Sequence, residues 1–198
     1  MITKIRYGNT NTFYVSGTNG GILVDTDWAG TLPAFYRAIK GKVKVEQIKY
    51  LLITHYHPDH MGIAGELMEL GIKLLLLDVQ KDYVQYSDPI FAKEKNRSHI
   101  PIRAEQATVI TCQESRAFLN ELGINGEIVH TPGHSDDSIS LVLDDGSAIV
   151  GDLYTWESAM GYDNLQVMNS WNLLISKGVK LAFYGHAIEQ LIDGGGSG

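Results

Sequence analysis

The chain has 198 residues, of which 44% are hydrophobic and 20% charged, a composition that suits one folded domain and excludes a disordered protein. Its net charge of -7 disfavours nucleic-acid partners, because phosphate backbones require a basic surface. The single cysteine, Cys112, excludes an intrachain disulfide. Together with the absence of a signal-peptide pattern and of an apolar run of roughly 18 residues, it predicts a cytoplasmic protein with no membrane partner.

The first part of the chain predicts short strands that then alternate with helices. Thr31 is the expected N-cap of a helix over residues 31–40. Ile63, Leu67 and Leu70 recur at helical spacing and predict one buried face of a second helix. β-branched and aromatic runs, bounded by glycine- and asparagine-containing turns, predict strands over residues 2–7, 11–17, 20–25, 48–53 and 72–77.

The second part of the chain begins with a break in the pattern. Residues 78–86 are expected to be helical, and residues 78–106 as a whole to form an irregular lid or binding segment. Thr111 and Glu114 are spaced as a capping box that opens a helix. Asp163 is the expected cap of a long helix, and a short helix is expected after the last strand. The apolar face of the long helix is expected to carry Leu165, Met168, Trp171 or Asn172, and Ile175. The remaining strands are expected at residues 107–110, 127–130, 138–143, 147–151 and 181–184.

This order of elements indicates an α/β protein with two sheets covered by helices. Each half of the chain contains a hairpin and strands that are followed by helices. No segment divides the halves, so residues 1–193 are expected to form a single domain. Residues 194–198 read Gly-Gly-Gly-Ser-Gly and are expected to be a flexible linker or tail.

Residues that suit metal ions follow four of the predicted strands. Three of the chain's seven histidines and one aspartate lie within residues 55–60, directly after the strand at 48–53. His134, Asp152 and His186 each follow another strand. Imidazole and carboxylate groups bind zinc and similar metals, and strand ends on one sheet edge bring such groups together. One tetrahedral zinc needs three protein ligands and a water, so seven candidates suit two ions that share a carboxylate.

The chain resembles the metallo-β-lactamase fold superfamily over nearly its whole length. The matching motifs are His55-x-His57-x-Asp59-His60, Thr131-Pro132-Gly133-His134-Ser135, Gly151-Asp152 and Tyr184-Gly185-His186, which occur in this order. The resemblance implies a four-layer αββα sandwich of two mixed β-sheets flanked by helices. It also implies a binuclear metal site at one edge of the sandwich, with two zinc ions as the expected cofactors and iron or manganese as the alternative.

The same resemblance implies a role for each candidate ligand. His55, His57 and His134 would hold the first metal, and Asp59, His60 and His186 the second, with Asp152 bridging them. The expected chemistry is attack by a metal-bridging hydroxide on a small ester, thioester, lactone or lactam substrate. Asp59 would also accept the proton. Tyr154 follows Asp152 by two residues and is either a hydrogen-bond donor to the developing oxyanion or a packed aromatic side chain.

Several functions of this superfamily stay open at the level of sequence. The motifs are similar to those of small hydroxyacylglutathione hydrolases and lactonases. An iron-dependent oxidoreductase similar to persulfide dioxygenases, or a phosphodiesterase, is the alternative. A scaffold without catalysis is disfavoured, because all the expected ligands are present. The site therefore predicts the type of reaction better than the substrate.

Overall fold

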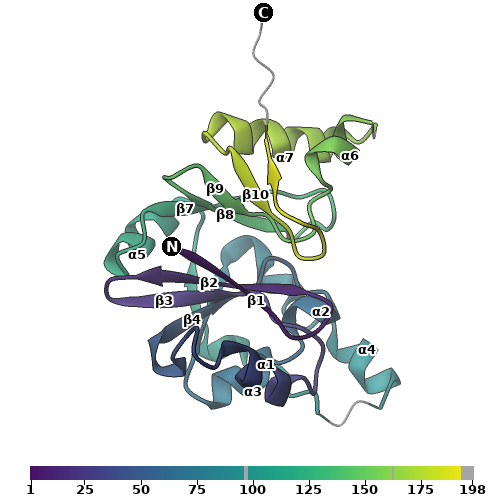
Figure 1. Cartoon of the computed structure of the whole chain (residues 1–198). Helices are drawn as coiled ribbons and strands as arrows, with labels where there is room; N and C mark the ends of the chain where they lie inside the picture. The colour runs from purple at the N-terminus through teal and green to yellow at the C-terminus, as the bar shows by residue number, and fades with distance from the viewer. Residues whose placement is uncertain (96–97, 162, 193–198) are drawn as a thin grey trace, which may run out of the picture.

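The computed structural model describes residues 1–95, 98–161 and 163–192. Two β-sheets lie face to face, with helices on the outer face of each (Figure 1). The first sheet has the order β1-β2-β3-β4-β5-β6 and the second β11-β10-β9-β8-β7. Both sheets contain parallel and antiparallel pairs, so both are mixed. The predicted four-layer αββα sandwich is thereby confirmed, whereas the predicted tail at 194–198 lies outside the described residues.

The elements of the first sheet and its helices come mainly from the first part of the chain. The strands are β1 (Ile2–Arg6), β2 (Asn11–Gly17), β3 (Gly20–Val24), β4 (Ile48–Leu52), β5 (Lys73–Leu77) and β6 (Thr108–Ile110). The α-helices are α1 (Leu32–Ile39), α2 (Pro58–Met61), α3 (Ala64–Glu69) and α4 (Asp88–Lys93). Three short 3₁₀ helices are η1 (Val45–Gln47), η2 (Asp78–Tyr83) and η3 (Ala104–Gln106).

The second sheet and its helices follow. Its strands are β7 (Gly126–His130), β8 (Ile139–Leu143), β9 (Ser147–Ile149), β10 (Leu181–Phe183) and β11 (Gln190–Leu191). The helices are α5 (Ser115–Glu121), α6 (Trp156–Met160) and α7 (Leu165–Ser176). In Figure 1, α6 and α7 cover the outer face of this sheet, and α1 and α3 lie below the first sheet. No helix within the described ranges has the length and hydropathy needed to cross a bilayer.

Three separate layers of apolar side chains hold the sandwich together. Successive residues of β4 point to opposite faces, so Leu51 packs toward the helices and Leu52 packs between the two sheets. Leu74 and Leu75 of β5 divide in the same way. A third layer lies between the second sheet and α7, where Trp171 is fully buried. The central strands are therefore apolar on both faces, which explains their continuous hydrophobic runs.

Four local predictions were wrong, each because tertiary packing overrode a local pattern. Asn164 caps α7, since its Oδ1 accepts from the backbone N–H groups of residues 166 and 167, at 3.0 and 3.2 Å, in place of the predicted Asp163. The predicted face of α7 is displaced, because Leu165 is 76% exposed and Val167 and Leu174 are buried, although Trp171 is buried as predicted. Leu70 lies beyond the last turn of α3 and is 53% exposed. The chain closes with β11, which pairs with β10, and not with a helix.

The described residues of the segment 78–106 include η2 where a helix was expected, and also α4 and η3, which were not expected. The capping box at Thr111 and Glu114 is confirmed by two reciprocal bonds. Glu114 N donates to Thr111 Oγ1 at 3.2 Å, and Thr111 N donates to Glu114 Oε2 at 2.8 Å. Regular helix then begins one residue later, at Ser115.

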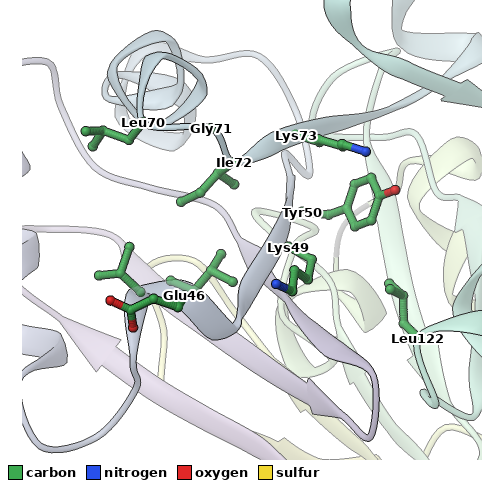
Figure 2. A pocket seen from close by; sticks show the side chains of 10 residues that line it. Glu46, Lys49, Tyr50, Leu70, Gly71, Ile72, Lys73 and Leu122 are labelled. Atoms are coloured by element: carbon green, nitrogen blue, oxygen red, sulfur yellow. The ribbon is translucent and has the colours of Figure 1, made fainter.

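The two ends of the central strands differ in chemistry. A hollow of about 560 Å³ lies at the starts of β4 and β5 and is lined by Glu46, Lys49, Tyr50 and Lys73, among others (Figure 2). None of its lining residues is a histidine or a cysteine. The histidine-rich residues 55–60 follow the opposite, carboxyl end of β4. The edge formed by the carboxyl ends of the strands is therefore the candidate functional edge.

Candidate metal centre

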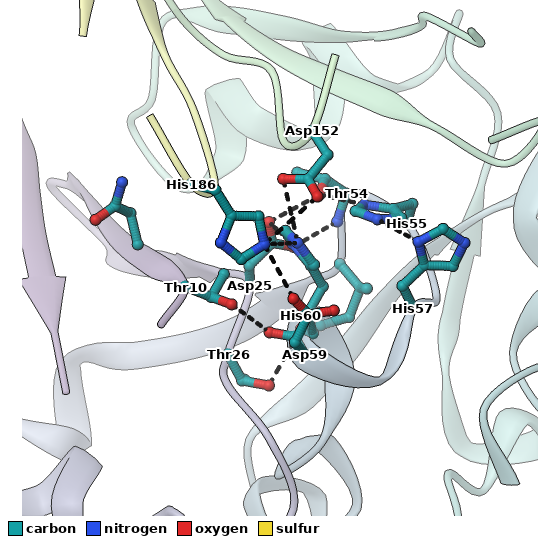
Figure 3. A network of polar contacts seen from close by, with 12 residues as sticks. Thr10, Asp25, Thr26, Thr54, His55, His57, Asp59, His60, Asp152 and His186 are labelled. Atoms are coloured by element: carbon teal, nitrogen blue, oxygen red, sulfur yellow. Dashed lines mark hydrogen bonds and ion pairs between the residues drawn. The ribbon is translucent and has the colours of Figure 1, made fainter. Parts of the chain in front are cut away.

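All seven predicted ligands lie at the functional edge and converge on one region. They follow four strands, with His55 and His57 after β4, Asp59 and His60 in α2, His134 after β7, Asp152 after β9, and His186 after β10. Figure 3 shows six of them facing a common centre. Asp59 and His60 lie on the single helical turn of α2.

Three histidine nitrogens form the first group. His57 Nδ1 lies 3.1 Å from His55 Nε2 and 3.1 Å from His134 Nε2. A proton on His57 Nδ1 can be donated to only one of these two nitrogens. Hydrogen bonding alone therefore leaves the lone pairs of ring nitrogens facing one another. Nitrogens bound to one tetrahedral zinc lie about 3.3 Å apart, given bond lengths of roughly 2.0–2.1 Å. The group therefore fits a single cation.

Asp59, His60 and His186 form the second group. His186 Nε2 lies 2.9 Å from Asp59 Oδ2 and 3.3 Å from His60 Nε2. The side chain of His60 is fully buried, whereas those of Asp59 and His186 are 32% and 39% exposed. The second group is thus open to solvent on one side, which leaves room for a water or a substrate atom.

Asp152 lies between the two groups. Its Oδ2 is 3.8 Å from His134 Nε2 and 3.5 Å from His186 Nε2, so one carboxylate oxygen reaches toward both. Its Oδ1 is buried, lies 3.3 Å from His60 Nε2, and has no hydrogen-bond partner within the described residues. A buried carboxylate oxygen without a donor is costly unless a positive charge compensates it. The position of Asp152 therefore suits a shared ligand.

The electrostatics of the centre follow from burial and from its two carboxylates. Burial, and then the charges of the neighbouring histidines, hold the pKa of His55 well below its usual range, so this imidazole is neutral and able to bind a metal. Burial lowers the pKa of His60, but the carboxylates of Asp25 and Asp152 outweigh it and raise the pKa to about 10. The two carboxylates therefore favour a positive charge at the His60 ring. A metal cation bound at Nε2 would supply this charge in place of the proton.

Asp25 is the main residue of the site that the sequence analysis missed. Its Oδ1 accepts from Thr54 N at 2.7 Å, and its Oδ2 accepts from Thr54 Oγ1 at 2.7 Å and from His60 Nδ1 at 2.9 Å. Thr54 Oγ1 lies 3.3 Å from His55 Nδ1. Because Asp25 takes the Thr54 proton, the hydroxyl oxygen accepts from His55. One carboxylate thus directs Nε2 of both histidines toward the centre, as outer carboxylates do in metal sites.

No local pattern could have identified this role. Asp25 ends a predicted strand 29 positions before Thr54 and looks like a loop residue in the sequence. Its only unusual feature is a φ of 60°, which few residues other than glycine adopt. The structure alone places it under the histidines, where it is fully buried.

Gly185 permits the close approach of the last ligand loop to the centre. A Cβ at this position would lie 2.5 Å from Asp152 Oδ1 and 2.6 Å from His60 Cε1. Gly151 has a similar role, because its φ is 58° and a Cβ would lie 2.4 Å from Thr54 Oγ1. The glycines of the Gly151-Asp152 and Gly185-His186 pairs are therefore required by space.

Two hollows flank the centre and share His134. One of about 390 Å³ is lined by Asp152, Tyr154, Tyr184 and His186, among others. The other, of about 260 Å³, includes His57, Tyr83 and Tyr86. Tyr154 therefore faces a cavity beside the candidate ligands, while its backbone carbonyl accepts from Trp171 Nε1 at 2.9 Å. The arrangement is compatible with both readings of Tyr154 and leaves its hydroxyl role a prediction.

Taken together, these features define a two-sheet αββα protein with a candidate metal centre of five histidines and two aspartates at one edge. Residues 5–186 match the family described as the metallo-beta-lactamase superfamily, so the chain belongs to that family.

Relatives of known sequence and structure agree with this assignment. The chain is 26% identical over 180 residues to "Beta-lactamase-like protein 2 homolog" of Drosophila melanogaster, covering 89% of this chain and 58% of the relative. It is 25% identical over 166 residues to "Atrochrysone carboxyl ACP thioesterase" of Aspergillus fumigatus, covering 82% and 32%. The chain thus spans only about a third to a little over half of the length of these relatives. The solved structure of TTHA1623 in a di-iron-bound form superimposes with a TM-score of 0.67 at 20% identity, covering 96% of this chain and 94% of that one.

Proposed function

We propose that this protein is a binuclear metal-dependent hydrolase that acts on a small ester, thioester, lactone or lactam. The observation that carries the proposal is the position of Asp152, whose Oδ2 lies between a three-histidine group and a second group that contains Asp59. A lone metal would not need this second group. The relative named as an acyl carrier protein thioesterase favours an acyl substrate.

The distances within the centre support the proposed ligand sets. His55, His57 and His134 would hold one ion and Asp59, His60 and His186 the other. Asp152, whose Oδ2 reaches toward His134 and His186, would be shared by both. We propose zinc at both positions, with iron or manganese as the alternative, because imidazole and carboxylate ligands suit all three metals. When bound, such a pair of ions supplies a water whose pKa falls toward about 7 and polarises the group under attack.

The chain's own residues would then orient the substrate and move the proton. Asp59 is only partly buried, so one of its oxygens can accept a proton at the solvent-open side of the centre. Tyr154 lines the larger flanking hollow, from which its hydroxyl would donate to a developing oxyanion. The two hollows on either side of His134 would receive the acyl portion and the leaving group.

A substrate panel combined with metal analysis tests this function. Protein purified without added metal is analysed for zinc, iron and manganese, and is then assayed on thioesters, lactones, β-lactams and phosphodiesters. We expect two metal equivalents and turnover of at least one carbonyl substrate. The variant His134→Ala should lose both turnover and one metal equivalent. The control His130→Ala removes a histidine that is not a candidate ligand and should lose neither. Activity that survives in His134→Ala would refute the assignment.

A second candidate function is iron-dependent oxidation. It is favoured by the likeness of the fold to TTHA1623, which was solved with two irons. Stoichiometric iron in the purified protein, with oxygen consumption on persulfides and no hydrolysis across the panel, would establish this function in place of the hydrolase. Turnover confined to phosphodiesters would instead establish the phosphodiesterase alternative.

A further inference from the structure

The chain just before β2 contacts both partly exposed members of the second ligand group, Asp59 and His186. The segment consists of Asn9, Thr10 and Asn11, the last of which is the first residue of β2. The segment belongs to the first sheet, whereas His186 follows β10 of the second sheet. Figure 3 shows Thr10 beside the ligands Asp59 and His186. The contacts of these three residues are directed to the second group and not to the histidines of the first.

Asn11 fixes the backbone on either side of His186. Its backbone N–H donates to Gly185 O at 2.7 Å. Its side-chain Nδ2 donates to Tyr184 O at 2.9 Å and to Ala187 O at 3.1 Å. Three hydrogen bonds from one residue thus span the loop that carries the ligand. Asn11 is 1% exposed, so water does not compete for these bonds.

Asn9 and Thr10 contact the ligands themselves. His186 Nδ1 lies 3.3 Å from Asn9 O, and because a carbonyl only accepts, this contact places the proton on Nδ1 and leaves Nε2 free. Thr10 Oγ1 donates to Asp59 O at 2.7 Å, which ties the turn of α2 to the same segment. Thr10 N donates to the buried carboxylate of Asp27 at 2.9 Å, and this bond fixes Thr10 in turn.

Packing does not hold the two ligands that this segment contacts. The side chains of His55 and His60 are almost completely buried, whereas those of Asp59 and His186 are about one third exposed. Asn11 Oδ1 is buried without a hydrogen-bond partner among the described residues, and burying such a polar atom is unfavourable. An apolar side chain would avoid this cost if the position served packing alone. The favourable contribution of Asn11 therefore comes from the bonds donated by its amide.

We propose that Asn9, Thr10 and Asn11 form a clamp that positions Asp59 and His186, and that this clamp determines whether the chain binds a second metal ion. The inference rests on the binuclear site proposed above. The three residues are positioning residues, since they act through the ligands and their backbone. Without the clamp, the group of His55, His57 and His134 keeps its geometry, and only the second position loses affinity.

Metal titration of variants tests the clamp without an activity assay. Metal-free protein is titrated with Zn²⁺ in competition with a chromophoric chelator, for the unaltered chain, Asn11→Ala, Thr10→Val and Thr10→Ser. Thr10→Val keeps the branched shape and removes the hydroxyl, and Thr10→Ser restores the hydroxyl. Asn19→Ala is the matched control, because Asn19 Nδ2 also donates to a distant backbone carbonyl, that of Glu121, at 2.9 Å. Circular dichroism of each metal-free variant checks the fold.

We expect the unaltered chain, Thr10→Ser and Asn19→Ala to bind two equivalents. Asn11→Ala and Thr10→Val should bind the first equivalent as before and the second at least tenfold more weakly. If Asn11→Ala does not fold, Thr10→Val decides. The clamp proposal alone would be overturned by either of two results in folded clamp variants. In the first, both metal equivalents bind with unaltered affinity; in the second, both bind more weakly to the same extent. Fewer than two equivalents in the unaltered chain would instead overturn the binuclear function, and the clamp with it.

Discussion

Asp25 Oδ2 lies 2.9 Å from His60 Nδ1, and the two side chains are 1% and 0% exposed. The pair joins the end of β3 to α2 below the candidate metal centre. Since the carboxylate also accepts two bonds from Thr54, whose hydroxyl contacts His55, the orientation of both His55 and His60 depends on this one acid. Its removal is therefore the sharpest test of how the centre is oriented.

We predict that Asp25→Ala weakens metal binding about 10- to 100-fold, because the ligand histidines lose the group that fixes their tautomers. The metal-free protein should also lose about 3 kcal/mol of unfolding free energy, since buried donors of Thr54 and His60 lose their acceptor. Urea unfolding and zinc titration measure the two effects. Asp144→Ala, at a 51% exposed carboxylate, is the control that should change neither by much. Unchanged zinc affinity in Asp25→Ala would exclude the orienting role.

Removing the metal should destabilise the folded chain, because the five histidines and two aspartates of the centre then face one another without a cation. Ligand binding at a concentration 1,000 times its dissociation constant adds about 4 kcal/mol per site. We expect the melting temperature to fall on addition of a chelator and to recover with excess Zn²⁺. A melting temperature that is indifferent to chelator, in protein shown to contain metal, would contradict a structural contribution of the ions.

The two readings of Tyr154 predict different kinetics for Tyr154→Phe. If the hydroxyl donates to an oxyanion, kcat should fall about 100-fold, with KM, metal content and melting temperature unchanged. If the side chain serves packing alone, the ring that remains should preserve kcat within about twofold. Tyr83→Phe, in the other flanking hollow, is the matched control. Steady-state kinetics on the best substrate of the panel decide between the readings.

The lack of space around Gly185 predicts that a larger residue at this position disrupts the candidate metal centre selectively. In Gly185→Ala, the new Cβ would lie 2.5 Å from Asp152 Oδ1, so the carboxylate or the loop must move. We expect loss of at least one metal equivalent and of turnover. Gly161→Ala is the control, since the nearest atom to its Cβ is Ser158 O at 3.8 Å. A Gly185→Ala protein with full metal content and full activity would show that the loop adapts freely.

An ion-pair network away from the centre gives a prediction for pH. Glu127 accepts from Arg116 and from Lys177, each at 2.9 Å, and although burial alone would raise its pKa, these partners lower it below its usual range. A carboxylate whose pKa is lower in the folded state stabilises the fold above its unfolded pKa. This stabilisation is lost as the pH falls through the folded pKa. Glu127→Gln should therefore cost about 1 kcal/mol at pH 7, a modest value because the cations are partly exposed, and less at pH 3.

Urea unfolding of the Glu127→Gln variant at both pH values measures this difference. Glu105→Gln removes the same negative charge at an exposed carboxylate that has no ion pair within the described residues, and it serves as the comparison. An equal cost at pH 7 and pH 3 would mean that Glu127 acts through packing and not through its charge.

The sequence by itself determined most of the strands and helices, and it named the candidate ligands. Both follow from short-range information. Continuous apolar runs mark strands that are buried on two faces, and the residue types at strand ends are printed in the chain. The sandwich followed as well, because two groups of such strands need helices to cover their outer faces.

Only the tertiary structure decided which distant groups orient those ligands. Asp25 and Thr54 are 29 positions apart, and Asn11 and Ala187 are 176 apart, yet each pair is joined by a hydrogen bond. Which side of α7 faces the core was likewise decided by the packing around Trp171, and not by the local apolar pattern. The first pair depends on the pairing of β3 with β4, and the second on how the two sheets pack, and both are properties of the whole chain. The candidate ligands could therefore be named from the sequence, whereas the residues that orient them could not.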